Sequence, residues 1–104
     1  MGDISHAIQA TIEKAGFSVV EDYVGHGTGR KLHDEPQIPC FGEPNTGPPL
    51  SENQILAIEV MYTDVPSDLF TAEDGWTVIA ESAKLAALFE KTVMVGKRKA
   101  LILT

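Results

Sequence analysis

The order of the apolar runs in this sequence constrains the fold more than any single motif does. The first run places Ile4, Ile8 and Ile12 four residues apart, the spacing of a helix that buries one face. Each later run is short, rich in β-branched and aromatic residues, and bounded by turn-forming residues, as β-strands are. We therefore predict a helix over residues 3–15 and strands at residues 17–24, 53–63, 75–80, 87–95 and 99–104.

This order also predicts the fold class. One helix followed by strands over hairpin-length gaps is typical of an α+β domain, with an antiparallel sheet that carries the helix on one face. The length of 104 residues suits a single domain over residues 1–104. We expect a glycine-rich segment at residues 25–36, a proline-rich loop at residues 36–49, and a connection or hairpin at residues 64–75.

Charge and composition exclude several kinds of partner. The net charge is −7, with eight Lys and Arg against fifteen Asp and Glu, so nucleic acid and anionic membranes are poor partners. No apolar run approaches the length of a bilayer span, and the polar N-terminus does not resemble a signal peptide. The single cysteine, Cys40, cannot form an internal disulfide, which favours a reducing compartment. We expect a soluble cytoplasmic domain.

Two glutamates interrupt the apolar strands. Glu59 lies inside ILAIEVM and Glu90 lies inside ALFEKTV. A carboxylate inside a sheet is costly unless it is paired, hydrogen-bonded or bound to a metal. Alternatively, each glutamate faces solvent on a half-exposed sheet, which is the commoner arrangement for acidic residues.

His26 lies between two glycines in the segment GHGTGRKLHDEP. It is either a turn histidine in a flexible loop or a ligand. With Glu59 and Glu90 it would form a set of one imidazole and two carboxylates, which suits Mn, Fe(II), Co or Zn. The flanking glycines would let the backbone pass close to such a site and adopt positive φ.

Several segments resemble, in order and spacing, the C-terminal half of a type I methionine aminopeptidase. They are DISHAIQ, GFSVVEDYVGHGTGRKLHDEPQI, AIEVM, EDGWTV and ALFEKTV. The resemblance covers nearly the whole chain and is weakest in the proline-rich loop and the last residues. It implies one half of the pita-bread fold, with a curved antiparallel sheet. It also implies an enzyme family that removes N-terminal methionine from proteins and peptides with a metal-activated water.

The resemblance further implies a role for each site residue. His26, Glu59 and Glu90 would be metal ligands, with Glu90 bridging the two divalent ions (Co, Mn, Fe or Zn) of the complete family site. His33 would not ligate, and would hydrogen-bond the substrate near the scissile peptide. Glu59 is also the candidate proton acceptor.

The same resemblance implies a pocket for the methionine side chain. Trp76 and Leu32 fall where the family lines that pocket. An apolar wall is reasonable there, because methionine offers only a flexible thioether for recognition.

Part of the family's site has no counterpart in this sequence. The two aspartate ligands of the family lie in its N-terminal half, and this chain starts at the equivalent of the C-terminal half. Three ligands would hold at most one metal ion, so we expect the chain alone to be inactive or weak. The sequence also departs from the family at residues 58–60 and 88–91, beside two ligand positions, where neighbours tune metal affinity.

Three functional hypotheses follow. The chain is a catalytic-half fragment of a methionine aminopeptidase, a half-size protein that pairs with itself or with a separate N-terminal half, or a non-enzymatic peptide- or protein-binding module. An exposed sheet edge and apolar face would favour association. The presence of His26, Glu59 and Glu90 argues against the binding module.

Overall fold

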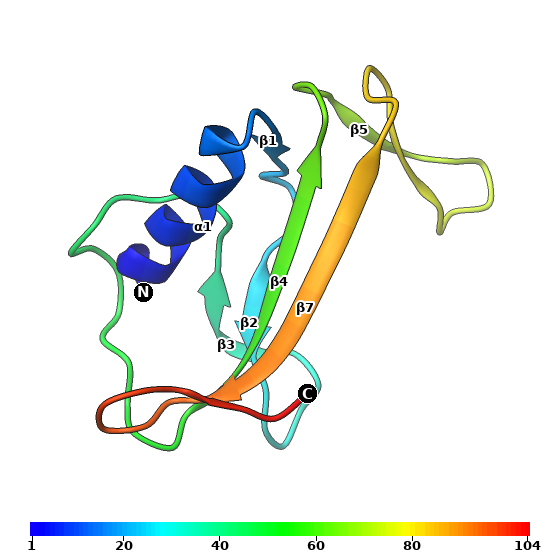
Figure 1. Cartoon of the computed structure of the whole chain (residues 1–104). Helices are drawn as coiled ribbons and strands as arrows, with labels where there is room; N and C mark the ends of the chain where they lie inside the picture. The colour runs from blue at the N-terminus through cyan, green and yellow to red at the C-terminus, as the bar shows by residue number, and fades with distance from the viewer.

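The computed structural model describes residues 1–104 and contains one helix and eight strands (Figure 1). The elements are α1 (Gly2–Lys14), β1 (Ser18–Val19), β2 (Gly25–Gly27), β3 (Asp34–Ile38), β4 (Ile55–Thr63), β5 (Leu69–Thr71), β6 (Val78–Ala80), β7 (Ala86–Met94) and β8 (Leu101–Ile102). All strand pairs are antiparallel. No helix is both long and apolar enough to cross a membrane.

The large sheet has the strand order β3-β2-β4-β7-β8, with β1 also paired to β4. The longest pairing in this sheet is between β4 and β7. It runs without a register shift from Ile55 opposite Met94 to Thr63 opposite Ala86. β5 and β6 form a separate hairpin that projects beyond one end of this ladder (Figure 1). The β4–β7 pairing therefore forms the centre of the large sheet, and the β5–β6 hairpin is a separate two-stranded sheet.

The helix covers one face of the sheet, and the core lies between them (Figure 1). Leu56 and Val93, partners in the β4–β7 register, are buried there with Met1 and Ile38. Ile4, Ile58 and Val95 pack against this cluster. The alternation of a strand therefore sends Leu56 and Ile58 toward the helix and Ala57 and Glu59 to the opposite face.

The expected fold class is confirmed, and so are the helix and the two long strands, within one or two residues. The helix ends before Gly16, whose φ of +85° favours glycine at this position. The expected strand at residues 17–24 is reduced to β1. The expectation of irregular structure at residues 25–27 and 34–38 is wrong, because both segments pair in the sheet as β2 and β3.

Candidate functional site

The glycines beside His26 allow β2 to fit between two other strands. A Cβ at Gly27 would lie 2.1 Å from the carbonyl oxygen of Glu35, and a Cβ at Gly25 would lie 2.6 Å from that of Ala57. Neither glycine has a positive φ. The expectation of positive φ is therefore wrong, and the close approach of neighbouring backbone is the reason for glycine here.

This packing buries His26 and fixes the direction of its ring. Its Nδ1 lies 2.7 Å from the carbonyl oxygen of Gly27, and because a carbonyl only accepts, Nδ1 carries a hydrogen. Its Nε2 lies 3.0 Å from Oε1 of Glu59, in the only contact of the structure between a basic and an acidic side chain. Two acceptors cannot face each other at this distance without a cation between them. The contact is therefore a hydrogen bond through one shared proton, or it brings together two atoms that ligate the same metal ion from one side.

Glu59 and Glu90 stand directly opposite each other in the β4–β7 ladder. The N–H of Asp64 donates to the carbonyl of Leu85 at one end of the ladder. At the other end, the N–H of Val95 donates to the carbonyl of Gln54. Hydrogen-bonded and non-hydrogen-bonded pairs alternate along an antiparallel ladder. Counting inward from the hydrogen-bonded pair at either end shows that Glu59 and Glu90 form a non-hydrogen-bonded pair. In that arrangement the Cα atoms lie about 4.5 Å apart and both side chains leave the same face.

The structure does not gather all three expected ligands into one cluster. No group of three or more His, Cys, Asp or Glu side chains lies close enough together to hold a metal ion. His26 and Glu59 are in contact. Glu90 is exposed, and it lies beside Glu59 only because the two residues are opposite each other in the β4–β7 register.

His33 lies beside His26, at the other end of the loop between β2 and β3. The two ring centroids are 4.3 Å apart, with the ring planes inclined by 58°. Both rings line a polar cavity of about 380 Å³ with Val24, Lys31, Asp34, Glu35 and Gln37. The segment GHGTGRKLH therefore brings its two histidines into one cavity.

Trp76 and Leu32, the expected pocket residues, are exposed. Trp76 is 87% exposed in the turn of the β5–β6 hairpin, and Leu32 is 74% exposed in the loop between β2 and β3. Neither residue lines the cavity that contains His26 and His33 or the apolar groove at Met61 and Leu88. Their role as a pocket stays a prediction.

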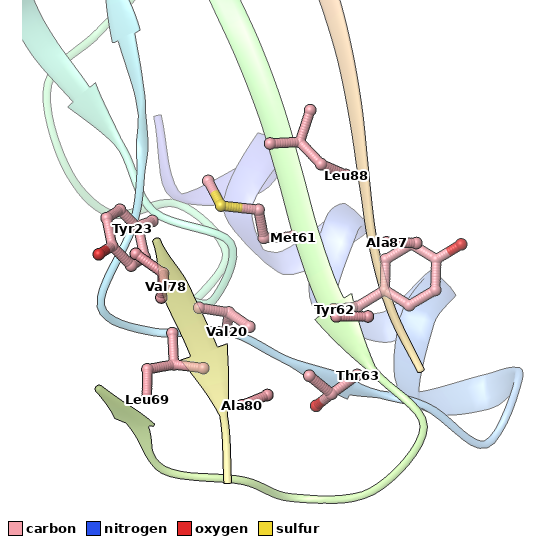
Figure 2. Close-up of a pocket in the computed structure, with 11 residues that line it drawn as sticks. Val20, Tyr23, Met61, Tyr62, Thr63, Leu69, Val78, Ala80, Ala87 and Leu88 are labelled. Atoms are coloured by element: carbon pink, nitrogen blue, oxygen red, sulfur yellow. The ribbon is translucent and has the colours of Figure 1, made fainter. Parts of the chain in front are cut away.

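An apolar groove that the sequence reasoning did not identify lies next to the glutamate pair. Met61 and Leu88 face each other in the ladder two residues beyond Glu59 and Glu90, and so lie on the same face. Both line a groove of about 370 Å³. Figure 2 shows that its other walls come from the β5–β6 hairpin and the chain after β1. The remaining lining residues are Val20, Tyr23, Tyr62, Thr63, Leu69, Val78, Ala80, Ala86 and Ala87. Strand alternation in the sequence places Met61 on the same face as Glu59, but it does not indicate the other walls of the groove.

Cys40 supports the strand that carries Glu59. It is fully buried, and its Sγ–H donates to the carbonyl oxygen of Glu59 at 3.3 Å. Burial raises the pKa of the Cys40 thiol, and the nearby charge of Glu59 adds to that rise. The thiol is therefore an inert packing group.

Comparisons with known proteins show the family to which this chain belongs. The model of metallopeptidase family M24 matches residues 1–97. Methionine aminopeptidase 1 of Bacillus subtilis is 45% identical over 104 residues, which is 100% of this chain and 42% of that protein. The methionine aminopeptidase of Clostridium perfringens is 48% identical over 93 residues, which is 89% of this chain and 37% of that protein.

Solved structures show the same likeness. The methionine aminopeptidase of Thermotoga maritima matches with a TM-score of 0.95 and 47% identity, over 99% of this chain and 41% of that one. The Rickettsia prowazekii enzyme matches with a TM-score of 0.92 and 42% identity, over 97% and 41%. The expected resemblance to methionine aminopeptidases and to their pita-bread fold is confirmed, although the chain spans only 37% to 42% of the length of these four relatives. This chain belongs to metallopeptidase family M24.

Proposed function

We propose that this chain provides one half of a metallopeptidase site that removes N-terminal methionine from peptides and proteins. The observation that carries the proposal is the contact between His26 and Glu59. Nδ1 of His26 is committed to a backbone carbonyl, and Nε2 faces a carboxylate oxygen at 3.0 Å, so a nitrogen and an oxygen that could both ligate a metal ion lie side by side. The relatives that support the reaction are methionine aminopeptidases.

The residues present fit a divalent ion. His26, Glu59 and Glu90 offer one imidazole and two carboxylates, and rotation of the exposed Glu90 side chain would add it to the existing pair. This hard-to-borderline set suits Mn, Fe(II), Co or Zn, and we propose at most one ion on this chain. Such an ion lowers the pKa of a bound water and polarises the substrate carbonyl.

The other residues of the proposed site bind and orient the peptide. His33, beside His26 and exposed to the cavity, would hydrogen-bond the substrate near the scissile bond. Glu59 would accept the proton released during hydrolysis. The groove at Met61 and Leu88 offers an apolar surface next to the glutamate pair. Trp76 and Leu32, now exposed, would extend the apolar wall for the methionine side chain if they turned toward it.

We expect weak or no hydrolysis by this chain alone. It spans about 40% of its relatives, and no group of three ligands is assembled. Association with a second copy or with a separate N-terminal half would cover the exposed apolar residues of β7. A reducing compartment such as the cytoplasm fits its single cysteine.

Isothermal titration calorimetry with Mn(II), Co(II) and Zn(II) tests the proposal. We expect the wild type to bind one ion, and Glu59→Gln and Glu90→Gln to weaken binding at least tenfold. Glu81→Gln, which changes an exposed carboxylate away from the site, is the matched control and should bind as the wild type does. Absence of binding by the wild type, or equal binding by Glu59→Gln, would contradict the proposal.

A peptide-binding module without catalysis is the second candidate. One observation favours it: the apolar groove is formed in the structure, whereas the three-ligand cluster is not. An NMR titration of the isotope-labelled protein with a Met-Ala-Ser peptide, without metal, distinguishes the two candidates by chemical-shift changes. Shifts at Met61 and Leu88 in a protein that binds no metal would support the module.

A further inference from the structure

β4 lacks a strand partner along the middle of one edge. Its other edge pairs with β7 over the whole length of both strands. On the first edge, β2 pairs with residues 56–57 and β1 pairs with residues 62–63. No strand pairs with residues 58–61 on this side, and we call this stretch the β4 gap. Glu59, one of the proposed metal ligands, lies within it.

The backbone groups of Glu59 and Met61 point into the β4 gap. Both residues belong to non-hydrogen-bonded pairs of the β4–β7 ladder, so their N–H and C=O groups point away from β7. The carbonyl of Met61 accepts from the N–H of Val20. Residues 20–24, which connect β1 to β2, supply no bond to the carbonyl of Glu59 or to the N–H of Met61. These two groups therefore need a partner from elsewhere in the chain.

The thiol of Cys40 is that partner. Its Sγ–H donates to the carbonyl of Glu59 at 3.3 Å. Burial raises the pKa of this thiol, and the N–H of Met61, which is directed at the same sulfur, offsets part of that rise. A thiol is both a weak donor and a weak acceptor, so one side chain replaces the N–H and the C=O that a neighbouring strand would offer. Because Cys40 is fully buried, water does not compete for these contacts at the sulfur.

The β4 gap separates Glu59 from the strand that carries His26. β2 pairs with β4 no further than Ala57, two residues before Glu59. The side chains of Ala57 and Glu59 share one face, so the 3.0 Å contact with His26 requires β4 to keep its course beyond the end of β2. On this edge of β4, the thiol of Cys40 is the group that holds the backbone of Glu59.

We propose that Cys40 is a positioning residue, whose thiol holds the backbone of Glu59 in the place where its carboxylate meets His26. The thiol is unreactive and acts through its hydrogen bonds, without contacting the metal ion or the peptide. This inference rests on the proposed function, because Glu59 and His26 act there as ligands of one ion.

Calorimetry with Mn(II) tests the effect of Cys40 on metal binding. Mn(II) prefers oxygen and nitrogen ligands, so a weaker affinity in a Cys40 variant is not the loss of a sulfur ligand. We expect Cys40→Ala to weaken Mn(II) binding by about tenfold, the lower end for groups that orient a ligand. Cys40→Ser, whose hydroxyl also donates and accepts, should restore most of that affinity.

Val93→Ala is the control that separates positioning from stability. Val93 is buried in the core on the helix side of β7, whereas Glu59 lies on the opposite face of the sheet. Val93→Ala should therefore lower the free energy of unfolding without weakening Mn(II) binding. Equal Mn(II) binding by Cys40→Ala and the wild type would overturn the proposal. Failure of Cys40→Ser to restore affinity, or an equal loss of affinity in Val93→Ala, would also overturn it.

Two NMR measurements in the presence of a chelator test the geometry without metal. Cys40→Ala should speed hydrogen exchange at the amide of Met61 but not at that of Val60, which points toward β7. Cys40→Ala should also shift the ¹⁵N resonance of His26 Nε2, which contacts Glu59, and Cys40→Ser should not. If either measurement is the same for Cys40→Ala and the wild type, the positioning role is wrong. A wild type that binds no Mn(II), in a chain where Cys40→Ala causes both changes, would overturn the proposed metal site alone.

Discussion

The centre of the large sheet and the β5–β6 hairpin differ in the interactions that position their candidate site residues. In the centre, a nine-residue ladder and two glycines in tight contact with neighbouring backbone fix His26 and Glu59 within 3.0 Å of each other. The hairpin has strands of three residues and leaves Trp76 exposed at its turn. Long-range pairing thus determines where the ligand candidates lie, whereas the pocket candidate Trp76 depends on a local turn.

The largest effect should come from filling the space beside Gly27. Gly27→Ala would put a Cβ 2.1 Å from the carbonyl oxygen of Glu35, a backbone atom, so β2 and β3 must separate. We expect a loss of about 3 kcal/mol in the free energy of unfolding, at the upper end for overpacking. Denaturant titration measures it. Gly29→Ala is the control, because a Cβ there meets nothing within 4 Å, and an equal loss in both variants would contradict the role of Gly27.

A second test compares the core with the hairpin by truncating one apolar side chain in each. Leu56 is fully buried beneath α1, so Leu56→Ala should cost about 3 kcal/mol of unfolding free energy through lost burial and a cavity. Phe70 on β5 is about half exposed, and Phe70→Ala should cost under about 1 kcal/mol. Thermal unfolding followed by circular dichroism compares the two, and similar losses would show that the hairpin is part of the core.

The hairpin turn at Asp74 should respond to acid. The side-chain hydroxyl of Thr77 and the N–H groups of Trp76 and Thr77 donate to the Asp74 carboxylate and lower its pKa. A lowered folded-state pKa means that the stabilisation is present above the pKa of unfolded Asp and is lost as the pH falls through the folded value. Trp76 fluorescence should therefore change in acid, in a step that Asp74→Asn removes. An unchanged step in Asp74→Asn would assign it to another group.

The smallest effect should come from Trp76 itself. It is 87% exposed, so Trp76→Ala should change the free energy of unfolding by no more than about 0.5 kcal/mol. If Trp76 contributes to peptide binding, the same variant should weaken binding of a Met-Ala-Ser peptide. Equal peptide binding by Trp76→Ala and the wild type would remove it from the proposed pocket.

The sequence predicted the parts of the fold that have a strong periodic signal. Ile4, Ile8 and Ile12 indicated the helix, and the two long apolar runs indicated β4 and β7. The mid-strand positions of Glu59 and Glu90 singled out the pair that the ladder places side by side.

The short strands and the groove could not be predicted in the same way. β2 is mostly glycine and β3 contains a proline, and both residues disfavour strands intrinsically, so tertiary pairing overrides local preference there. The groove depends on how the β5–β6 hairpin folds over Met61 and Leu88, which no local pattern encodes.

The most direct test of the account is ¹⁵N NMR of the histidine side chains during titration with Zn(II). The proposed site makes His26 a ligand through Nε2 and leaves the neighbouring His33 free to bind substrate. We predict that Zn(II) moves the Nε2 resonance of His26 while the ring nitrogens of His33 keep the shifts of an unligated imidazole. A His26 ring that does not respond to Zn(II), or a His33 ring that ligates in its place, would contradict the proposed site.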